Sequence, residues 1–258
     1  MQTSLADRRE EMEADYGFPL PLDIPDYRTA IRGAWRIDAH RGGLSSSYVA
    51  THAIENAHYV LFREGVPWMA SSLLEIESHA WHLHKARGVV AVAGLGMGMF
   101  AHAAAAKPEV ERVIVAEIDP DVIALVTGSI ALSPKIHIVC CDAASDDFRA
   151  SIRELTGARQ IDYLFADIWP VYPEPEAPAW TAALVERLKP RQAGWWGQEA
   201  EMAVRAYADG LSLEANDLTA ALAALGVPCD ATEGYAMFCR DVAAAHELDL
   251  AQRPSPAL

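Results

Sequence analysis

The chain has 258 residues, enough for one large α/β domain or for one domain with a small appendage. Hydrophobic residues make up 52% and charged residues 22%, as in an ordinary globular protein, and no apolar run approaches the roughly 18 to 20 residues of a membrane helix. We therefore expect no membrane partner, and because the formal net charge of −15 repels phosphate backbones, we expect no nucleic-acid partner either.

The first 28 residues are charged and then interrupted by prolines, which predicts a flexible arm. The opening stretch MQTSLADRREEMEADYG contains no apolar core of a signal peptide. The four cysteines show neither metal-ligand nor redox spacing. We therefore expect a cytoplasmic protein with reduced cysteines.

Residues 29–87 predict a β-rich N-terminal extension and a linking helix. Short β-like pieces alternate with turns in the order AWRIDA, SSYVATHA, HYVLFRE and VPWMASS. A helix over 73–87 is indicated by apolar residues at positions 73, 76, 80 and 83. The extension also offers a surface through which two subunits could pair, so we keep a homodimer as a hypothesis.

Residues 88–250 alternate between strand and helix patterns, which predicts a doubly wound, mostly parallel sheet with helices on both faces. The expected strands are 89–93, 112–117, 136–140, 161–166, 193–197 and, near the C-terminus, 235–243. The expected helices are 98–107, 120–127, 145–156, 177–188 and 213–225. The predicted fold class is α/β, a Rossmann-like sheet of about seven strands, and we expect the tail that follows to be frayed.

The most informative segment is VVAVAGLGMGMFAHAAAAKPEVERVIVAEIDPD. A buried-type strand ends in Gly94, Gly96 and Gly98, and the next strand ends in Glu117, 19 residues after the last glycine. Glycines let the backbone approach a ligand closely, and an acid at the neighbouring strand end can accept both ribose hydroxyls. The pattern predicts an adenosine-containing cofactor, with a turn that binds no ligand as the alternative.

The glycine spacing separates two cofactor classes. Dinucleotide-binding turns usually read G-x-G-x-x-G/A, whereas this turn reads G-x-G-x-G and places Met99 after the last glycine, which disfavours NAD. With the later segments VCCDAASDDF and IDYLFADIWP, the chain resembles the Rossmann-like (class I) S-adenosylmethionine-dependent methyltransferases over roughly residues 60 to 200. EIDPDVI (117–123) and CDA (141–143) are most similar to the spermidine synthase branch of that superfamily.

This resemblance implies S-adenosyl-L-methionine as cofactor and gives each motif a role. The glycine turn and Glu117 would hold the nucleoside, Asp142 would contact the adenine amino group, and Asp167 would face the transferable carbon. The residues expected to bind the cofactor are Gly94, Gly96, Gly98, Glu117, Ile118, Asp142 and Ala143. Asp167 is the expected catalytic residue, since a carboxylate there can hold an acceptor nitrogen and receive its proton.

Two departures bear on the reaction. Spermidine synthases carry an aspartate where this chain has Met97, and an Asp-x-x-Asp-Pro element where it has only Asp167-Ile168-Trp169-Pro170. The latter is somewhat similar to the Asp-aromatic-Pro turn of N-methyltransferases that act on guanidino compounds. We therefore expect methyl transfer to a small, amine-bearing acceptor, which Glu174, Glu176 and Glu199 could surround if it is cationic. Aminopropyl transfer and a non-catalytic nucleoside-binding module are the alternatives.

Several residues have structural interpretations that the sequence leaves open. Asp142 could cap the helix that begins near Ser145, and Asp167 could simply form a turn before Pro170. The tryptophans could wall a substrate pocket, although packing is the more usual fate of Trp68, Trp195 and Trp196. Three histidines of one helix lack a metal-binding pattern and predict a partly exposed helix face: His79, His82 and His84.

Overall fold

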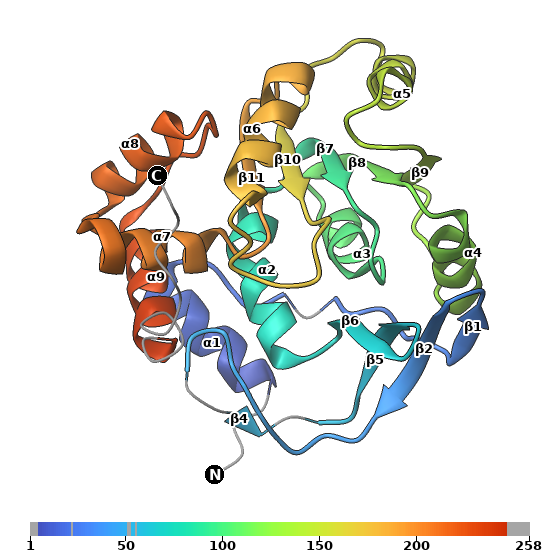
Figure 1. The fold of residues 1–258 in the computed structure, drawn as a ribbon, viewed down its shortest axis with the longest axis horizontal. Coiled ribbons are helices and arrows are strands. Elements are labelled where there is room, and N and C mark those ends of the chain that lie inside the picture. The colour runs from blue at the N-terminus through green and yellow to red at the C-terminus, as the bar shows by residue number, and fades with distance from the viewer. Residues whose placement is uncertain (1–4, 22, 51–52, 55, 247–258) are drawn as a thin grey trace.

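The computed structural model describes residues 5–21, 23–50, 53–54 and 56–246. At its centre is a five-stranded sheet in which every neighbouring pair is parallel (Figure 1). Its strands, in chain order, are β7 (Gly88–Ala93), β8 (Val110–Glu117), β9 (Ile136–Cys140), β10 (Tyr163–Ala166) and β11 (Gln192–Trp195). Their order across the sheet is β11-β10-β7-β8-β9, so the chain starts in the middle and winds outward in both directions.

Helices connect successive strands, as parallel pairing requires. These crossover helices are α3 (Met99–Ala106), α4 (Pro120–Ser129), α5 (Asp146–Thr156) and α6 (Ala177–Leu188). Strands β7 and β8 are almost wholly buried, which explains why their sequences are largely apolar. The observed elements lie within one or two residues of the predicted bounds in most cases, and β9 and α6 match them.

The parallel sheet has five strands rather than the predicted seven. After β11 the described chain forms only helices: α7 (Gln198–Asp209), α8 (Ala215–Ala224) and α9 (Glu233–Ala245). The strand predicted at 235–243 is therefore wrong. Four of its five buried residues recur at the helical spacing i, i+3, i+4, i+7, and these four are Tyr235, Phe238, Cys239 and Val242. The predicted frayed tail from 247 onward lies outside the described residues.

A smaller antiparallel sheet precedes the parallel one and has the strand order β1-β2-β5-β6. Its strands are β1 (Ala30–Arg32), β2 (Trp35–His40), β5 (His58–Arg63) and β6 (Val66–Ala70). The short strands β3 (Leu44–Ser45) and β4 (Ala53–Ile54) pair with each other, and residues 46–50 of the predicted piece SSYVATHA are not strand. Helix α2 (Leu73–Lys85) leads from β6 into β7 and begins at Ser72, whose hydroxyl accepts a hydrogen bond from the backbone N–H of Glu75.

The small sheet is tied to the large one at the end of β8. The indole N–H of Trp35 donates to a carboxylate oxygen of Asp119 (2.8 Å), and the same carboxylate caps α4 through the backbone N–H of Asp121. Helix α4 also packs against β1 and β2. This connection places β2, β5 and β6 over the carboxyl ends of the parallel strands (Figure 1).

The N-terminal segment is packed, in contrast to the predicted flexible arm. Helix α1 (Leu5–Tyr16) lies against α9, and the aromatic ring of Phe18 packs between those of Trp81 and Phe238. The phenol of Tyr16 donates a hydrogen bond to Asp241 on α9 (2.7 Å). The prediction failed because α1 buries only Met12 and Tyr16 along a charged sequence, too few apolar positions to reveal a docked helix.

We expect Tyr16→Phe to lower the free energy of unfolding by about 1 to 2 kcal/mol, because it removes one hydrogen bond to a carboxylate in a partly buried contact. Urea unfolding measures the change. Tyr207→Phe, at an exposed position on α7, is the matched control and should unfold like the wild type. Equal stability of the two variants would mean that α1 is not held to α9 through this contact.

Within the described residues, no helix combines the length and the apolar character needed to cross a membrane.

Candidate functional site

The winding direction of the parallel sheet reverses between β7 and β10. The chain leaves β7 toward β8 on one side and leaves β10 toward β11 on the other, which opens a crevice at the carboxyl ends of these two strands. Gly94 follows β7 and Asp167 follows β10, and the backbone N–H of Asp167 donates to the carbonyl of Ala93 (2.8 Å). Two segments more than 70 residues apart in the sequence are thus joined at the point where open α/β sheets bind ligands.

A cavity of about 450 Å³ lies at this crevice. Seven of the eight residues that the sequence predicted as site residues line it, and they come from the ends of four neighbouring strands. These are Gly94, Gly96, Glu117, Ile118, Asp142, Ala143 and Asp167.

Gly98 does not line the cavity. It precedes α3 in the left-handed conformation (φ +76°), and a Cβ at this position would crowd Val126 and Ile130 at 3.1 and 3.2 Å. Gly94 and Gly96 also have positive φ but present bare backbone to the cavity. The three glycines therefore divide into two that border the cavity and one that allows α3 to pack against α4.

Glu117 is held rigidly at the tip of β8. One carboxylate oxygen accepts the backbone N–H of Leu95 in the glycine turn (3.0 Å), and the other accepts that of Asp119 (2.9 Å). Each oxygen keeps a second lone pair for another donor. The carboxylate thus links the glycine turn to the next strand end and faces the cavity in a fixed orientation.

Asp142 forms the turn after β9 but does not cap α5. Its carboxylate accepts the backbone N–H of Ala144 (2.8 Å), whereas the cap of α5 is Ser145, whose hydroxyl accepts that of Phe148 (3.2 Å). The capping role considered for Asp142 is therefore filled by Ser145. Asp142 remains available at the cavity.

Asp167 lies at the centre of the cavity wall, partly exposed to it. Burial, followed by the negative charge of Glu117, raises the pKa of the Asp167 carboxyl to about 7. A carboxyl group with a pKa near neutrality can take up and release protons under ordinary conditions, which suits a general base.

The opposite wall of the cavity comes from elements that the sequence did not connect with the site. The small sheet contributes Trp35, Arg63 and Trp68, and the first turn of α2 contributes Glu75. Five of the seven tryptophans line the cavity, three from β2, β6 and α6 and two from the loops after β10 and β11: Trp35, Trp68, Trp180, Trp169 and Trp196. Trp68 and Trp196 are thus wall residues rather than pure core, whereas Trp195 lies buried in the sheet.

The cavity is strongly acidic. Its described lining includes five carboxyl groups but a single basic side chain, that of Arg63. The acidic members are Glu75, Glu117, Asp119, Asp142 and Asp167. The acids suggested around a cationic acceptor, Glu174, Glu176 and Glu199, are not among the lining residues.

Glu199 instead belongs to a buried network with the histidines of α2. Its carboxylate accepts the hydroxyl of Tyr48 (3.0 Å) and lies 3.5 Å from His82, whose other ring nitrogen pairs with Tyr163 (2.8 Å). His79 and His82 are buried, not partly exposed as predicted, and burial lowers the pKa of each imidazole to about 3. Across the described residues we find no cluster of ligands suited to a metal ion.

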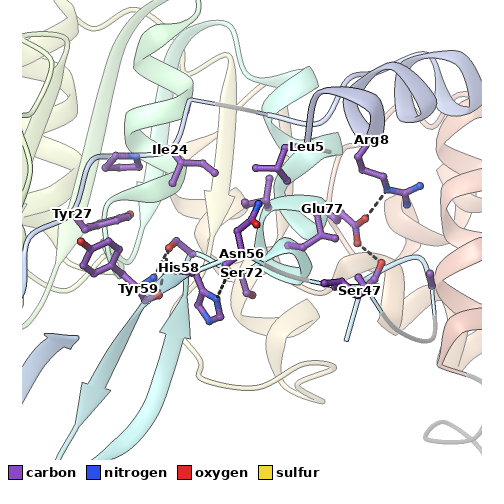
Figure 2. Close-up of a pocket in the computed structure, with 18 of the residues that line it drawn as sticks. Leu5, Arg8, Ile24, Tyr27, Ser47, Asn56, His58, Tyr59, Ser72 and Glu77 are labelled. Atoms are coloured by element: carbon purple, nitrogen blue, oxygen red, sulfur yellow. Dashed lines mark hydrogen bonds and ion pairs between the residues drawn. The ribbon is translucent and has the colours of Figure 1, made fainter. Parts of the chain in front are cut away.

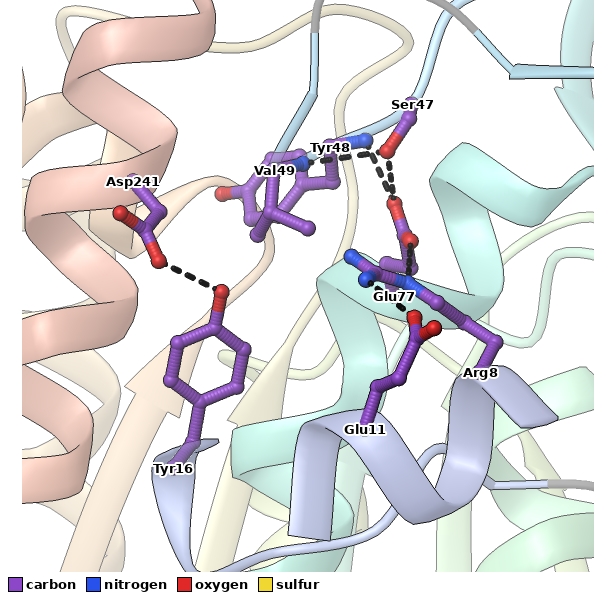
Figure 3. Close-up of polar contacts among 8 residues, drawn as sticks. All are labelled: Arg8, Glu11, Tyr16, Ser47, Tyr48, Val49, Glu77 and Asp241. Carbon is purple, nitrogen blue, oxygen red and sulfur yellow. Dashed lines mark hydrogen bonds and ion pairs between the residues drawn. The ribbon is translucent and has the colours of Figure 1, made fainter. Parts of the chain in front are cut away.

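A second cavity, of about 560 Å³, lies between α1, α2 and β5 (Figure 2). The carboxylate of Glu77 in this cavity already has partners, because it accepts hydrogen bonds from the guanidinium of Arg8 (2.9 Å) and from the hydroxyl of Ser47 (2.6 Å). Figure 3 shows the same carboxylate also accepting the backbone N–H of Tyr48 (2.7 Å). Because these contacts hold the fold together, we take the acidic cavity at the strand ends as the functional site.

Comparison with known proteins finds no matching family model and no matching curated protein. Solved structures with partial similarity include the spermidine synthase of Thermotoga maritima (16% identity, 67% of this chain and 56% of that chain, TM-score 0.36). Spermidine synthase in complex with the transition state analogue AdoDATO (16% identity, 67% and 55%, TM-score 0.35) and MNMC2 from Aquifex aeolicus (15% identity, 80% and 85%, TM-score 0.34) are similar to the same degree. This chain spans little more than half the length of the spermidine synthases, and similarity at this level assigns no activity to it.

Proposed function

We propose that this protein is an S-adenosylmethionine-dependent methyltransferase that acts on a small, amine-bearing acceptor. The observation that carries the proposal is the meeting, in one cavity at the switch point of the sheet, of a bare glycine turn, a strand-end acid and a second carboxylate with a near-neutral pKa. The first two features suit a nucleoside, and the third suits the removal of a proton from an acceptor.

The residues on the β8 and β9 side of the cavity fit the nucleoside. Gly94 and Gly96 border the cavity with backbone atoms alone, and Glu117 retains lone pairs for the ribose hydroxyls. Asp142 follows the next strand of the sheet and lines the same cavity, and we expect it to accept a hydrogen bond from the adenine amino group. Together these side chains would hold the sugar and the base, while Ile118 and Ala143 provide apolar contact.

Asp167 would bind the acceptor and remove its proton. When bound, the cofactor supplies an electrophilic methyl carbon whose bond to the positively charged sulfur breaks with the electron pair going to sulfur. Asp167 would accept the proton of an ammonium acceptor, which frees the nitrogen lone pair for the new N–C bond, and would later release that proton to water. Most of the remaining rate enhancement would come from holding the two partners in line.

Titration with S-adenosylhomocysteine tests the nucleoside site. We expect binding to the wild type and a loss of roughly 1 to 3 kcal/mol for Glu117→Ala, the scale of hydrogen bonds made to a charged acceptor. Glu111→Ala, an exposed acid on the same strand, is the control and should bind like the wild type. Unchanged affinity in Glu117→Ala would remove this residue from the site, and no binding to the wild type would end the proposal.

Turnover experiments distinguish the reactions that this site could support. The wild type is incubated with S-adenosylmethionine or with its decarboxylated form, together with a panel of amines. The molecular masses of the products are then measured by mass spectrometry. We expect a gain of one methyl group. An aminopropyl gain would instead assign aminopropyl transfer, and nucleoside binding without any product would favour a binding module.

A further inference from the structure

One acidic side chain in the cavity wall is only partly satisfied by the rest of the fold. Glu75 occupies the third position of α2 and is only 5% exposed, and its Oε2 atom is buried without a hydrogen-bond partner in the described structure. A glutamate three residues after a serine cap commonly reaches back to the backbone N–H of that serine. No such contact forms with Ser72, and the carboxylate borders the cavity instead.

This arrangement is costly for the protein alone. A buried carboxylate oxygen without a donor loses its hydration and gains nothing in return. Burial raises the pKa of Glu75 well above its ordinary value, and the nearby charge of Asp167 raises it further, although hydrogen bonds from the backbone N–H of Ala70 and from the side chain of Trp196 partly offset both effects. Two carboxyl groups that disfavour each other's charge across one cavity would be relieved by a cation between them.

The surrounding aromatic side chains also suit a cation. Trp35 and Trp68 pack edge to face (ring centroids 5.4 Å apart), and the guanidinium of Arg63 lies over both rings at 5.3 and 5.7 Å. The wall therefore already carries two cation–π contacts of the protein's own. The remaining tryptophans of the cavity offer apolar faces to the body of a ligand.

We propose that Glu75 binds the ammonium group of the acceptor and selects a small amine with an apolar body over its neutral counterparts. The assignment rests on the proposed function for the place of the acceptor, and it adds the residue that recognises it and the charge that the acceptor carries. An alcohol of the same shape would leave Oε2 of Glu75 buried without a cationic partner, so the site would reject it. Glu75 and Asp167 then share one nitrogen, with Glu75 holding it and Asp167 receiving its proton.

The test compares amines with alcohols in the wild type and in Glu75→Gln. The probes are n-butylamine, benzylamine and phenethylamine with the three corresponding alcohols, titrated into the full-length protein with and without saturating S-adenosylhomocysteine. We expect the wild type to bind at least one amine more tightly than its alcohol, and Glu75→Gln to weaken that amine about tenfold or more while alcohol binding changes little. Affinity for S-adenosylhomocysteine should stay within about twofold, because Glu75 lies on α2 and not at the strand ends that carry the proposed nucleoside-binding residues.

Glu77→Gln is the matched control, a buried acid two residues along the same helix whose oxygens are occupied by Arg8, Ser47 and Tyr48. We expect this variant to lose stability in urea and to keep the preference for the amine. Glu75→Gln should show the opposite pattern, with stability equal to or above that of the wild type, because it removes an uncompensated buried carboxylate.

Two results would overturn the assignment: an amine preference that survives in Glu75→Gln, or a wild type that prefers no amine of the panel over its alcohol. Failure of the proposed function has a different signature. In that case S-adenosylhomocysteine does not bind the wild type, while the titrations without it still report whether amine binding depends on Glu75.

Discussion

Asp167→Asn is expected to lower kcat by about 100-fold or more while leaving the affinity for S-adenosylhomocysteine within about twofold, because an amide can hold the acceptor but cannot take its proton. Single-turnover measurements with an accepted amine and calorimetry with the nucleoside measure the two effects. Asp146→Asn, at an exposed position on α5, serves as the control and should keep wild-type turnover. Wild-type turnover in Asp167→Asn would mean that Asp167 only forms a turn and takes no part in the reaction.

The pKa of Asp167 gives this prediction a dependence on pH. Since the carboxyl titrates at about 7, the activity of the wild type should rise as the pH increases through 7, and this step should disappear in Asp167→Asn. Stability should change in the opposite sense. The raised pKa means that the charged carboxylate costs stability above pH 7 and costs none below about pH 4, where the group is protonated in both states. Asp167→Asn should therefore be more stable than the wild type at pH 8 and equal to it at pH 4.

Gly94→Ala is expected to destabilise the protein by about 3 kcal/mol or more and to abolish nucleoside binding. Gly94 has a φ of +93°, which side chains rarely adopt, and a Cβ there would collide with the backbone carbonyl of Asp167. Relieving that collision requires β7 and β10 to separate at the crevice itself. Urea unfolding and titration with S-adenosylhomocysteine measure the two consequences.

Two further glycine variants make this prediction specific. Gly128→Ala, in the exposed part of α4 with no atom near its added Cβ, should gain about 0.5 to 1 kcal/mol from better helix propensity. Gly96→Ala meets mainly the flexible side chain of Met69, so it should fold and bind the nucleoside more weakly. A stable Gly94→Ala variant with normal affinity would show that close approach between the glycine turn and Asp167 is not required.

Much of the parallel sheet was predictable because its determinants are local. Most of its strands are short, largely apolar runs bounded by turn residues, and helices between them begin at recognisable caps such as Asp119 and Ser145. The error at α9 arose from the same kind of information. Its apolar residues support either a strand or a helix over a short window, and the buried set Tyr235, Phe238, Cys239 and Val242 shows that the helical spacing was the correct one.

By itself the sequence determined one half of the candidate site. Gly94, Glu117, Asp142 and Asp167 all follow strands of a parallel sheet, and in such a sheet the carboxyl ends share one edge, so chain order alone brings them together. Only the tertiary structure decided the other half. Glu75 reaches the cavity because β6 and α2 pack over that edge, and nothing local in the sequence encodes contacts between side chains so far apart along the chain. The burial of its carboxylate, and with it the preference for a cation, follows from that packing.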